Sequence, residues 1–316
     1  MATNILNKDY AIVLDSTTIP DDSVKGLVRI DSVPLTVTVG AKSKLENDWT
    51  IPEIVADYEK EPTHTSCPSP ADFAKEYVKL FKDGVKDIVV IPMTQGISGT
   101  YQSAVIGKES LGDSQRDHVY VKDVKLANFG VANLLLALKP YLLARVTVTE
   151  LANTIDRLSA DSRLAFTLSD LHHLYSGGRL SKISFLIGMV LKIKPIIGIS
   201  LQDGKLHAEK KCRTFNEVDN YFLDIIGEFY KKYRKVYVRY IDLTEEALRL
   251  NLEKKAAAKF PNLVTTAISE VGPLFTIHLG RSGYGLSVIG DDPIAEPANV
   301  EEAHGLRKLL DKIYKR

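Results

Sequence analysis

Short apolar runs alternate with amphipathic segments through the first half of the chain. The runs over residues 10–14, 88–91 and 118–121 are rich in Val, Ile and Tyr and are typical of buried strands. Longer segments over about 69–83, 99–110 and 128–144 carry apolar residues at helical spacing or are apolar throughout. Strands that alternate with such helices predict a parallel sheet with crossover helices, which is an α/β/α domain.

The helix expected after residue 69 has the clearest local signature. Ser69 can cap its first turn, Pro70 and Asp72 suit that turn, and Gly84 ends the helix. Its apolar stripe consists of Phe73, Tyr77, Leu80 and Phe81. This spacing buries one face of the helix against the predicted sheet.

The second half has a different pattern, because several of its strands follow one another without a helix between them. The expected strands are 163–168, 194–200, 205–210, 235–241, 263–267 and 274–279. The expected helices cover about 216–233 and 245–260. This order predicts an α/β sandwich with a mixed or antiparallel sheet. We therefore expect two domains, 1–160 and 161–316, with a boundary near residue 160.

Charge and cysteine content narrow the possible functions. The 41 Lys and Arg residues nearly balance the 40 Asp and Glu residues, so no strong field is present to attract nucleic acid. Cys67 and Cys212 match no metal-binding or disulfide pattern, so we expect no metal. The first residues contain no long apolar segment of a secretory signal, and we expect a cytoplasmic protein. The apolar stretch 183–199 is interrupted by two lysines and a proline, so no stable membrane insertion is expected.

Hydroxyl-bearing residues occur in three places: after two of the predicted strands, and before the helix predicted from residue 69. Asp15-Ser16 and Ser98-Gly99-Thr100 both follow strand ends, where ligands gather in parallel sheets. Ser98 is either a helix cap or part of a seat for an anionic oxygen. Thr65-Ser66-Cys67-Pro68-Ser69 allows the same two interpretations. Cys67 has no neighbouring motif that would activate it as a nucleophile.

Basic residues and glycines supply the other candidate features. Arg179 follows the helix stop Gly177-Gly178 and precedes the apolar stretch, although a surface arginine explains it equally well. His172 and His173 would point about 100° apart on a helix, which is wrong for chelating one metal. His278 lies in the predicted strand 274–279, before a glycine-rich segment, 280–285, that matches no nucleotide-binding motif.

Taken together, these stretches resemble the DegV family of bacterial fatty-acid-binding proteins. The matching residues run through nearly the whole chain: Asp15-Ser16-Thr17, Pro34-Leu35, Thr65-Ser66-Cys67-Pro68-Ser69, Ser98-Gly99-Thr100-Tyr101-Gln102-Ser103-Ala104, Asp170-Leu171, Gly177-Gly178-Arg179-Leu180-Ser181, Lys194-Pro195-Ile196 and His278. The resemblance implies two domains that enclose one long-chain fatty acid. It also implies a subunit that is not catalytic by itself and needs no cofactor. Its partner would be an ATP-binding fatty acid kinase, which makes acyl phosphate for phospholipid synthesis.

The resemblance also assigns roles to individual residues. Thr65 and Ser98 match the hydroxyls that hold the fatty acid carboxylate, and Ser66 and Gly99 match their neighbours. Arg179 and His278 match the basic residues near the head group. Arg213 matches a surface arginine that faces the kinase. Cys67 stands where the family commonly has glutamine, so a side-chain amide contact is not expected there.

An apolar tunnel should hold the acyl chain. Our hypothesis places its lining partly on Phe185, Leu186, Met189, Val190 and Leu191. Two alternatives remain open at this point. The first is a stand-alone acyl hydrolase or transferase that uses Ser98 or Cys67, for which no arranged base is visible. The second is a lipid carrier without a kinase partner.

Overall fold

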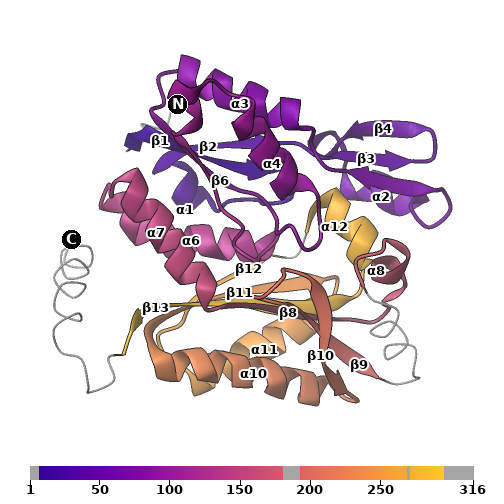
Figure 1. The fold of residues 1–316 in the computed structure, drawn as a ribbon. Helices are drawn as coiled ribbons and strands as arrows, with labels where there is room; N and C mark the ends of the chain where they lie inside the picture. The colour runs from indigo at the N-terminus through magenta and orange to yellow at the C-terminus, as the bar shows by residue number, and fades with distance from the viewer. Residues whose placement is uncertain (1–6, 181–192, 269–270, 295–316) are drawn as a thin grey trace.

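A computed structural model describes residues 7–180, 193–268 and 271–294 of the chain (Figure 1). Two larger sheets lie one above the other, with helices between them and on both outer faces. Within the described residues, no helix is both long enough and apolar enough to span a membrane.

The first sheet, sheet A, comes from the first half of the chain. Its strands are β1 (Asn7–Asp15), β2 (Val28–Val33), β6 (Asp87–Ile91) and β7 (Val119–Val121). They lie in the order β2-β1-β6-β7, and each neighbouring pair is parallel. Leu14 of β1 lies opposite Ile91 of β6, so both central strands end at the same edge. The predicted parallel α/β arrangement is confirmed.

Two helices cover the outer face of sheet A: α3 (Pro70–Lys82) and α4 (Thr100–Glu109). The side chains of Phe73 and Tyr77 on α3 pack against Ala11 and Val13 of β1. Ser69 caps α3 as predicted. Its hydroxyl accepts a hydrogen bond from the Asp72 backbone at 3.2 Å, and the Asp72 carboxylate accepts one from the Ser69 backbone at 2.8 Å.

The second sheet, sheet C, comes from the second half and is mixed, as predicted. Its strands are β8 (Ser162–Leu168), β9 (Lys194–Ile199), β10 (Leu206–Cys212), β11 (Tyr233–Leu243), β12 (Val264–Ile268) and β13 (Gly283–Pro293). Their order is β10-β9-β8-β13-β11-β12, in which only the pair β11 and β12 is parallel. Helices α10 (Phe215–Lys232) and α11 (Glu246–Lys259) cover the outer face.

One apolar helix, α6 (Phe129–Leu143), lies between the two sheets. It is apolar nearly all round, as a helix buried on every side must be. Its side chains belong to one hydrophobic core that includes residues of both sheets. Asn133 is a buried polar residue on this helix, and its amide donates to the backbone carbonyls of Tyr237 and Ser287 at 3.2 and 3.0 Å. The neighbouring helix α7 (Val148–Ala160) also contacts both sheets. The predicted domain boundary near residue 160 stays a prediction.

The remaining elements are short. They are α1 (Asp22–Lys25), β3 (Thr36–Val39), β4 (Lys42–Leu45), the 3-10 helix η1 (Glu46–Asp48), α2 (Ile51–Asp57), β5 (Thr63–Ser66), α5 (Asp113–Arg116), α8 (His172–Ser176) and α12 (Gly272–Leu279). Strands β4, β3 and β5 form a small antiparallel sheet that sequence analysis did not predict.

The prediction of a strand over 274–279 is wrong, because this segment is helix α12. Gly272 has φ +81° and Pro273 follows in the first turn, which suits a helix start. Gly280, with φ +75°, ends the helix. A short apolar run does not separate a buried strand from a buried helix, and the glycine and proline in front of it favoured the helix.

Asn128 ties the start of α6 to both halves of the chain. Its buried side-chain amide donates to the carbonyls of Thr17 and Val271, both at 2.7 Å. We expect Asn128→Ala to lower the free energy of unfolding by about 2 to 4 kcal/mol, because two buried carbonyls lose their donor. Urea denaturation measures this.

Asn262→Ala is the matched control, because Asn262 also has a positive φ but is exposed. It should cost about 1 kcal/mol, the price of the backbone conformation alone. Equal losses in the two variants would contradict the role given to the Asn128 hydrogen bonds.

Candidate ligand cavity

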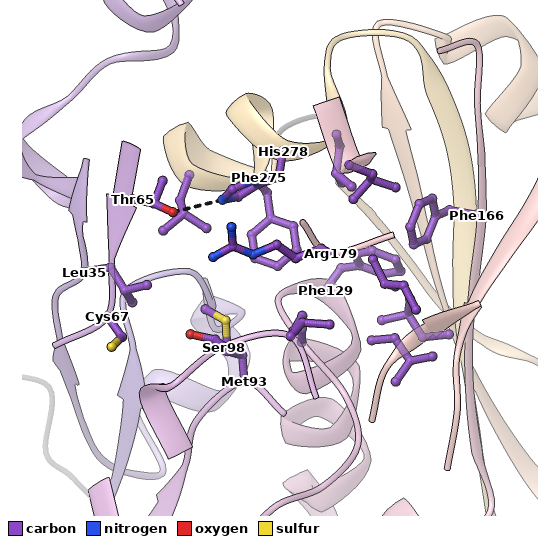
Figure 2. A pocket seen from close by; sticks show the side chains of 18 residues that line it. Leu35, Thr65, Cys67, Met93, Ser98, Phe129, Phe166, Arg179, Phe275 and His278 are labelled. Carbon is purple, nitrogen blue, oxygen red and sulfur yellow. Dashed lines mark hydrogen bonds between the residues drawn. The ribbon is translucent and has the colours of Figure 1, made fainter. Parts of the chain in front are cut away.

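An apolar cavity with polar groups at one side lies between the inner face of sheet C, the start of α6, α12 and the loops at the edge of sheet A (Figure 2). It holds about 670 Å³ of space outside atoms, including the part open to solvent. Its apolar lining is Leu35, Met93, Ile97, Ala127, Phe129, Leu164, Phe166, Leu174, Ile199, Leu206, Leu274, Phe275 and Leu279. Its polar lining is Thr65, Cys67, Ser98, Arg179 and His278. An apolar molecule with one polar end fits this division.

Two hydroxyl groups reach the cavity from the first half of the chain. Thr65 lies on β5, and Ser98 lies in the loop between β6 and α4. The Ser98 hydroxyl is 2.8 Å from the Thr100 hydroxyl and accepts from the Thr100 backbone at 3.3 Å. Ser98 therefore supports the first turn of α4 and also faces the cavity. The hydrogen bond from the Thr100 backbone agrees with a supporting role at the helix start, although Gly99 is the capping residue. The seat for an anionic oxygen stays a prediction.

Arg179 brings a positive charge to the same place. It follows α8 and Gly178, whose φ of +74° confirms the predicted left-handed stop, and it is half-buried. Its guanidinium donates to the carbonyl of Gly177, and among the described residues no carboxylate pairs with it. Burial lowers the pKa of the Arg179 guanidinium, although arginine stays charged at neutral pH. An anionic ligand group would supply the missing charge partner.

His278 faces the cavity from α12, next to Thr65. Its Nε2 atom lies 3.0 Å from the Thr65 hydroxyl, across the two halves of the chain. Burial lowers its pKa to about 4, with smaller contributions from the charges of Arg179 and His173. The imidazole is therefore neutral at neutral pH, and one of its nitrogens remains an acceptor. An anion placed near Arg179 would raise this pKa again.

A buried carboxylate positions α12. Glu46 of η1 accepts hydrogen bonds from the Ser16 hydroxyl at 2.5 Å and from the backbone of Leu274 at 3.2 Å. The pKa of Glu46 is raised to about 7, mainly by burial and to a smaller extent by the charge of Asp15, while the hydrogen bond from Ser16 opposes this rise. Sequence analysis missed Glu46, because nothing in its local sequence distinguishes it from a surface acid.

Four of the predicted head-group residues meet at the cavity: Thr65, Ser98, Arg179 and His278. The other two do not line it. Ser66, the next residue on β5, is exposed, and Gly99 is exposed at the cap of α4. A Cβ atom at Gly99 would lie 3.2 Å from the Cys67 sulfur, so this glycine gives Cys67 room. The head-group roles of all six residues stay predictions.

The remaining predicted residues lie elsewhere. Phe185, Leu186, Met189, Val190 and Leu191 fall outside the described residues. Arg213 is exposed beyond the end of β10. Leu206 lines the cavity at the start of that strand, about 20 Å from its end at ~3.3 Å per residue.

Sequence analysis also missed most of the apolar wall. Phe129, Phe166 and Phe275 come from three elements that only the tertiary fold brings together. Phe275 could have been found, since it lies three residues before His278. On a helix this spacing puts both side chains on one face.

A polar groove adjoins the cavity on the other side of His278. It is lined by Tyr58, Glu59, Thr63, Asp170, His172, His173, Ser176, Gly177, Ile277 and His278. His173 stacks on Tyr58 with ring centroids 5.3 Å apart, so it is not a free ligand. In the part of the chain that the structure describes, no three His, Cys, Asp or Glu residues are placed to hold a metal ion.

The hydrogen bonds do not form a nucleophile and base pair. His278 bonds to Thr65, whereas Ser98 bonds to Thr100. The Cys67 sulfur has the Ser103 hydroxyl at 4.0 Å as its neighbour. Covalent catalysis needs a base in contact with the nucleophile, and the described residues do not provide this contact. The geometry suits holding an anionic group more than attacking an ester.

Comparisons of the sequence with family models and with known proteins both find the DegV family. A family model described as "Uncharacterised protein, DegV family" matches residues 9–291. A DegV domain-containing protein of Listeria monocytogenes is 31% identical over 290 residues, which cover 89% of this chain and 99% of the relative.

Solved structures share the fold. A DegV family protein of Thermus thermophilus, described for its fatty acid binding, superimposes with a TM-score of 0.78 at 21% identity. The superposition covers 90% of this chain and 100% of the Thermus thermophilus chain. The fatty acid kinase B3 protein of Streptococcus pneumoniae, loaded with linoleic acid, has a TM-score of 0.74 at 21% identity. The superposition covers 89% of this chain and 99% of the Streptococcus pneumoniae chain.

The titration of His278 tests the electrostatics of the cavity. In the ligand-free protein we expect the imidazole to titrate near pH 4, and NMR of the ring resonances measures this. Arg179→Met should raise the midpoint only in part, because burial is the larger cause. A midpoint at or above 6.5 would contradict the described environment.

The same shift has a consequence for stability. Between about pH 4 and 6.5 the unfolded chain binds a proton that folded His278 does not bind. Stability should therefore rise with pH across this window. His278→Gln should remove that part of the rise.

Proposed function

The chain belongs to the DegV family, and on that premise we propose that it binds one long-chain fatty acid and presents the carboxylate to an ATP-dependent fatty acid kinase. The kinase would form an acyl phosphate for phospholipid synthesis, and the complex would act in the cytoplasm. In this proposal the chain is a binding subunit without catalytic activity or cofactor of its own.

The observation that carries the proposal is the cation at the polar side of an apolar cavity. Arg179 has no carboxylate partner among the described residues, and it lines the cavity together with Thr65 and Ser98. A fatty acid carboxylate supplies the opposite charge, and its chain matches the apolar lining. The described fatty acid binding of the Thermus thermophilus protein, which has the same fold, supports this choice.

The tail and the head group have different tasks in this account. Each buried methylene contributes about 0.8 kcal/mol, so about fifteen contribute a gross ~12 kcal/mol. This is comparable with the ~4 to 15 kcal/mol that association costs. The carboxylate loses water when it reaches Arg179, so its contacts add little net affinity. They fix where the carboxylate lies, and this orientation is what a presenting subunit needs.

Presentation also requires a route to the carboxylate. The polar groove lies on the other side of His278 from the cavity, and it is open to solvent. We propose that the kinase reaches the head group from this side. The fatty acid kinase B3 protein of Streptococcus pneumoniae has the same fold and was solved with bound linoleic acid. This similarity supports a fatty acid kinase as the partner.

Arg213 is proposed as a second contact with the kinase. It is exposed, and its backbone N–H donates to the Glu217 carboxylate at 2.9 Å. Among the described residues, its guanidinium forms no ion pair.

Ser98→Ala and Arg179→Ala test the head-group assignment. Both variants should retain the fatty acid, as counted by native mass spectrometry, because the tail supplies the affinity. Acyl-phosphate formation with the kinase and ATP should fall about ten- to hundred-fold, which corresponds to the loss of one charged hydrogen bond. Arg116→Ala is the control, because Arg116 pairs with Asp113 on α5 and does not line the cavity.

Each alternative has its own outcome in this experiment. If the wild-type protein takes up no fatty acid, the proposed binding function is wrong. If it binds the acid but no kinase phosphorylates it, the chain is a carrier. Turnover of acyl esters that disappears in Ser98→Ala would instead identify a hydrolase or transferase.

A further inference from the structure

Helices α8 and α12 pack together, and each ends at a glycine that faces a histidine of the other helix. His278 of α12 lies against Gly177, the residue after α8. His173 of α8 lies against Gly280, the residue after α12. Sequence analysis explained Gly177 only as part of a helix stop. The reciprocal contacts between the two helices indicate a second task for this glycine.

The backbone conformation of Gly177 does not require a glycine. Its φ of −71° and ψ of −7° are ordinary helical values that any residue adopts, whereas Gly178 has the left-handed φ of +74°. The constraint at Gly177 is space. A Cβ atom there would lie 2.8 Å from Nδ1 of His278, which is too short for a contact of a carbon atom. The imidazole therefore occupies the place of the missing side chain.

Gly177 also contacts the charged group at the polar side of the cavity. Its carbonyl accepts a hydrogen bond from the Arg179 guanidinium. The other ring nitrogen of His278, Nε2, lies 3.0 Å from the Thr65 hydroxyl, and Figure 2 shows the guanidinium beside this pair. Gly177 thus touches both basic groups of the proposed carboxylate site, although it lines the groove and not the cavity.

The second histidine–glycine contact holds α8 against α12. A Cβ atom at Gly280 would lie 3.0 Å from Cδ2 of His173, so the ring packs closely on this glycine. The same ring stacks on Tyr58 at the end of α2, with centroids 5.3 Å apart and planes 28° apart. His173 therefore joins its own helix to two further elements.

We propose that Gly177 is a positioning residue for the carboxylate site. Its bare α-carbon lets the His278 ring reach Thr65, and its carbonyl orients the Arg179 guanidinium. The reciprocal histidine–glycine contact holds α8 and α12 at the separation that this arrangement needs. The inference rests on the proposed fatty acid binding, and Gly177 acts through these side chains rather than on the ligand itself.

Gly177→Ala tests the proposal, because it adds one methyl group without straining the backbone. In the ligand-free variant the His278 ring should leave its buried position, so its NMR titration midpoint should rise from about 4 toward the ordinary 6.5. Bound fatty acid, counted by native mass spectrometry, should stay at the wild-type level. Acyl-phosphate formation with the kinase and ATP should fall about ten- to hundred-fold, because misplacing a reacting group by about 1 Å costs up to ~10²-fold.

Gly26→Ala is the matched control. Gly26 also follows a helix, α1, with a similar φ of −83° and the same ψ of −7°, but a Cβ atom there would meet nothing within 4 Å. This variant should keep the wild-type titration and the wild-type yield of acyl phosphate. If Gly177→Ala behaves like Gly26→Ala in both measurements, the proposal is wrong.

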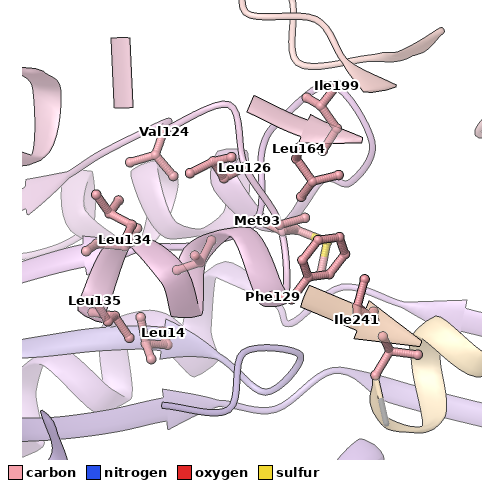
Figure 3. Packing of buried hydrophobic residues seen from close by; sticks show 14 of the residues in the cluster. Leu14, Met93, Val124, Leu126, Phe129, Leu134, Leu135, Leu164, Ile199 and Ile241 are labelled. Carbon is pink, nitrogen blue, oxygen red and sulfur yellow. The ribbon is translucent and has the colours of Figure 1, made fainter. Parts of the chain in front are cut away.

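Urea denaturation separates a local displacement from a loss of folding. The core around α6, part of which Figure 3 shows with Leu135 next to Leu14, includes none of these glycines or histidines. Gly177→Ala places no atom in that core. Its unfolding midpoint should therefore stay close to that of Gly26→Ala.

Two variants at His173 test the reciprocal contact, and they serve if Gly177→Ala does not fold. His173→Phe keeps a ring on Gly280 and Tyr58, whereas His173→Ala removes it. Both variants remove a charge that helps to lower the pKa of His278, so the difference between them reports packing alone. The His278 midpoint should rise more in His173→Ala. Equal midpoints in the two variants would overturn the proposal.

Failure of the proposed function gives a different result. The titration of His278 is measured in ligand-free protein and involves neither fatty acid nor kinase. A wild-type protein that binds no fatty acid, while Gly177→Ala still moves the His278 midpoint, would overturn the proposed function and support the positioning of the ring by Gly177.

Discussion

The fold depends on the burial of one apolar helix between two sheets. Helix α6 contributes side chains to a core that both sheets share, so neither sheet can shift without uncovering apolar surface. Each such side chain is worth about 1.5 to 3 kcal/mol when fully buried. Asn128 and Asn133 fix the position of α6 within this core, because their side-chain amides donate hydrogen bonds to backbone carbonyls of both halves of the chain. The helix therefore sets the distance between the two halves.

That distance creates the cavity. The first residue of α6 is Phe129, which lines the apolar wall, while Thr65 and His278 meet from opposite halves at 3.0 Å. Burial keeps His278 neutral and leaves Arg179 as the charged group at the polar side. One cation facing one proposed carboxylate gives a net neutral site.

Periodicity predicted the elements whose contacts are local in sequence. The strands of sheet A and the capped helix α3 followed from apolar runs and from Ser69, Pro70 and Asp72. Segment 274–279 was misassigned, since a short buried helix and a buried strand have the same composition. Motif resemblance found Thr65, Ser98, Arg179 and His278, whereas spacing alone left each with a structural explanation. Phe129 and Phe166 could not be predicted as cavity residues, because they lie on separate elements that only the tertiary fold brings together. Glu46 could not be predicted either, because its partner Leu274 lies more than two hundred residues away in the sequence.

A crystal structure of the protein with bound palmitate tests the central claim most directly. The account predicts that the carboxylate lies within hydrogen-bonding distance of Thr65, Ser98 or the Arg179 guanidinium. It also predicts that the chain runs past Phe129 between α6 and sheet C. A palmitate carboxylate located away from Arg179, or a chain lying outside the apolar cavity, would contradict the account.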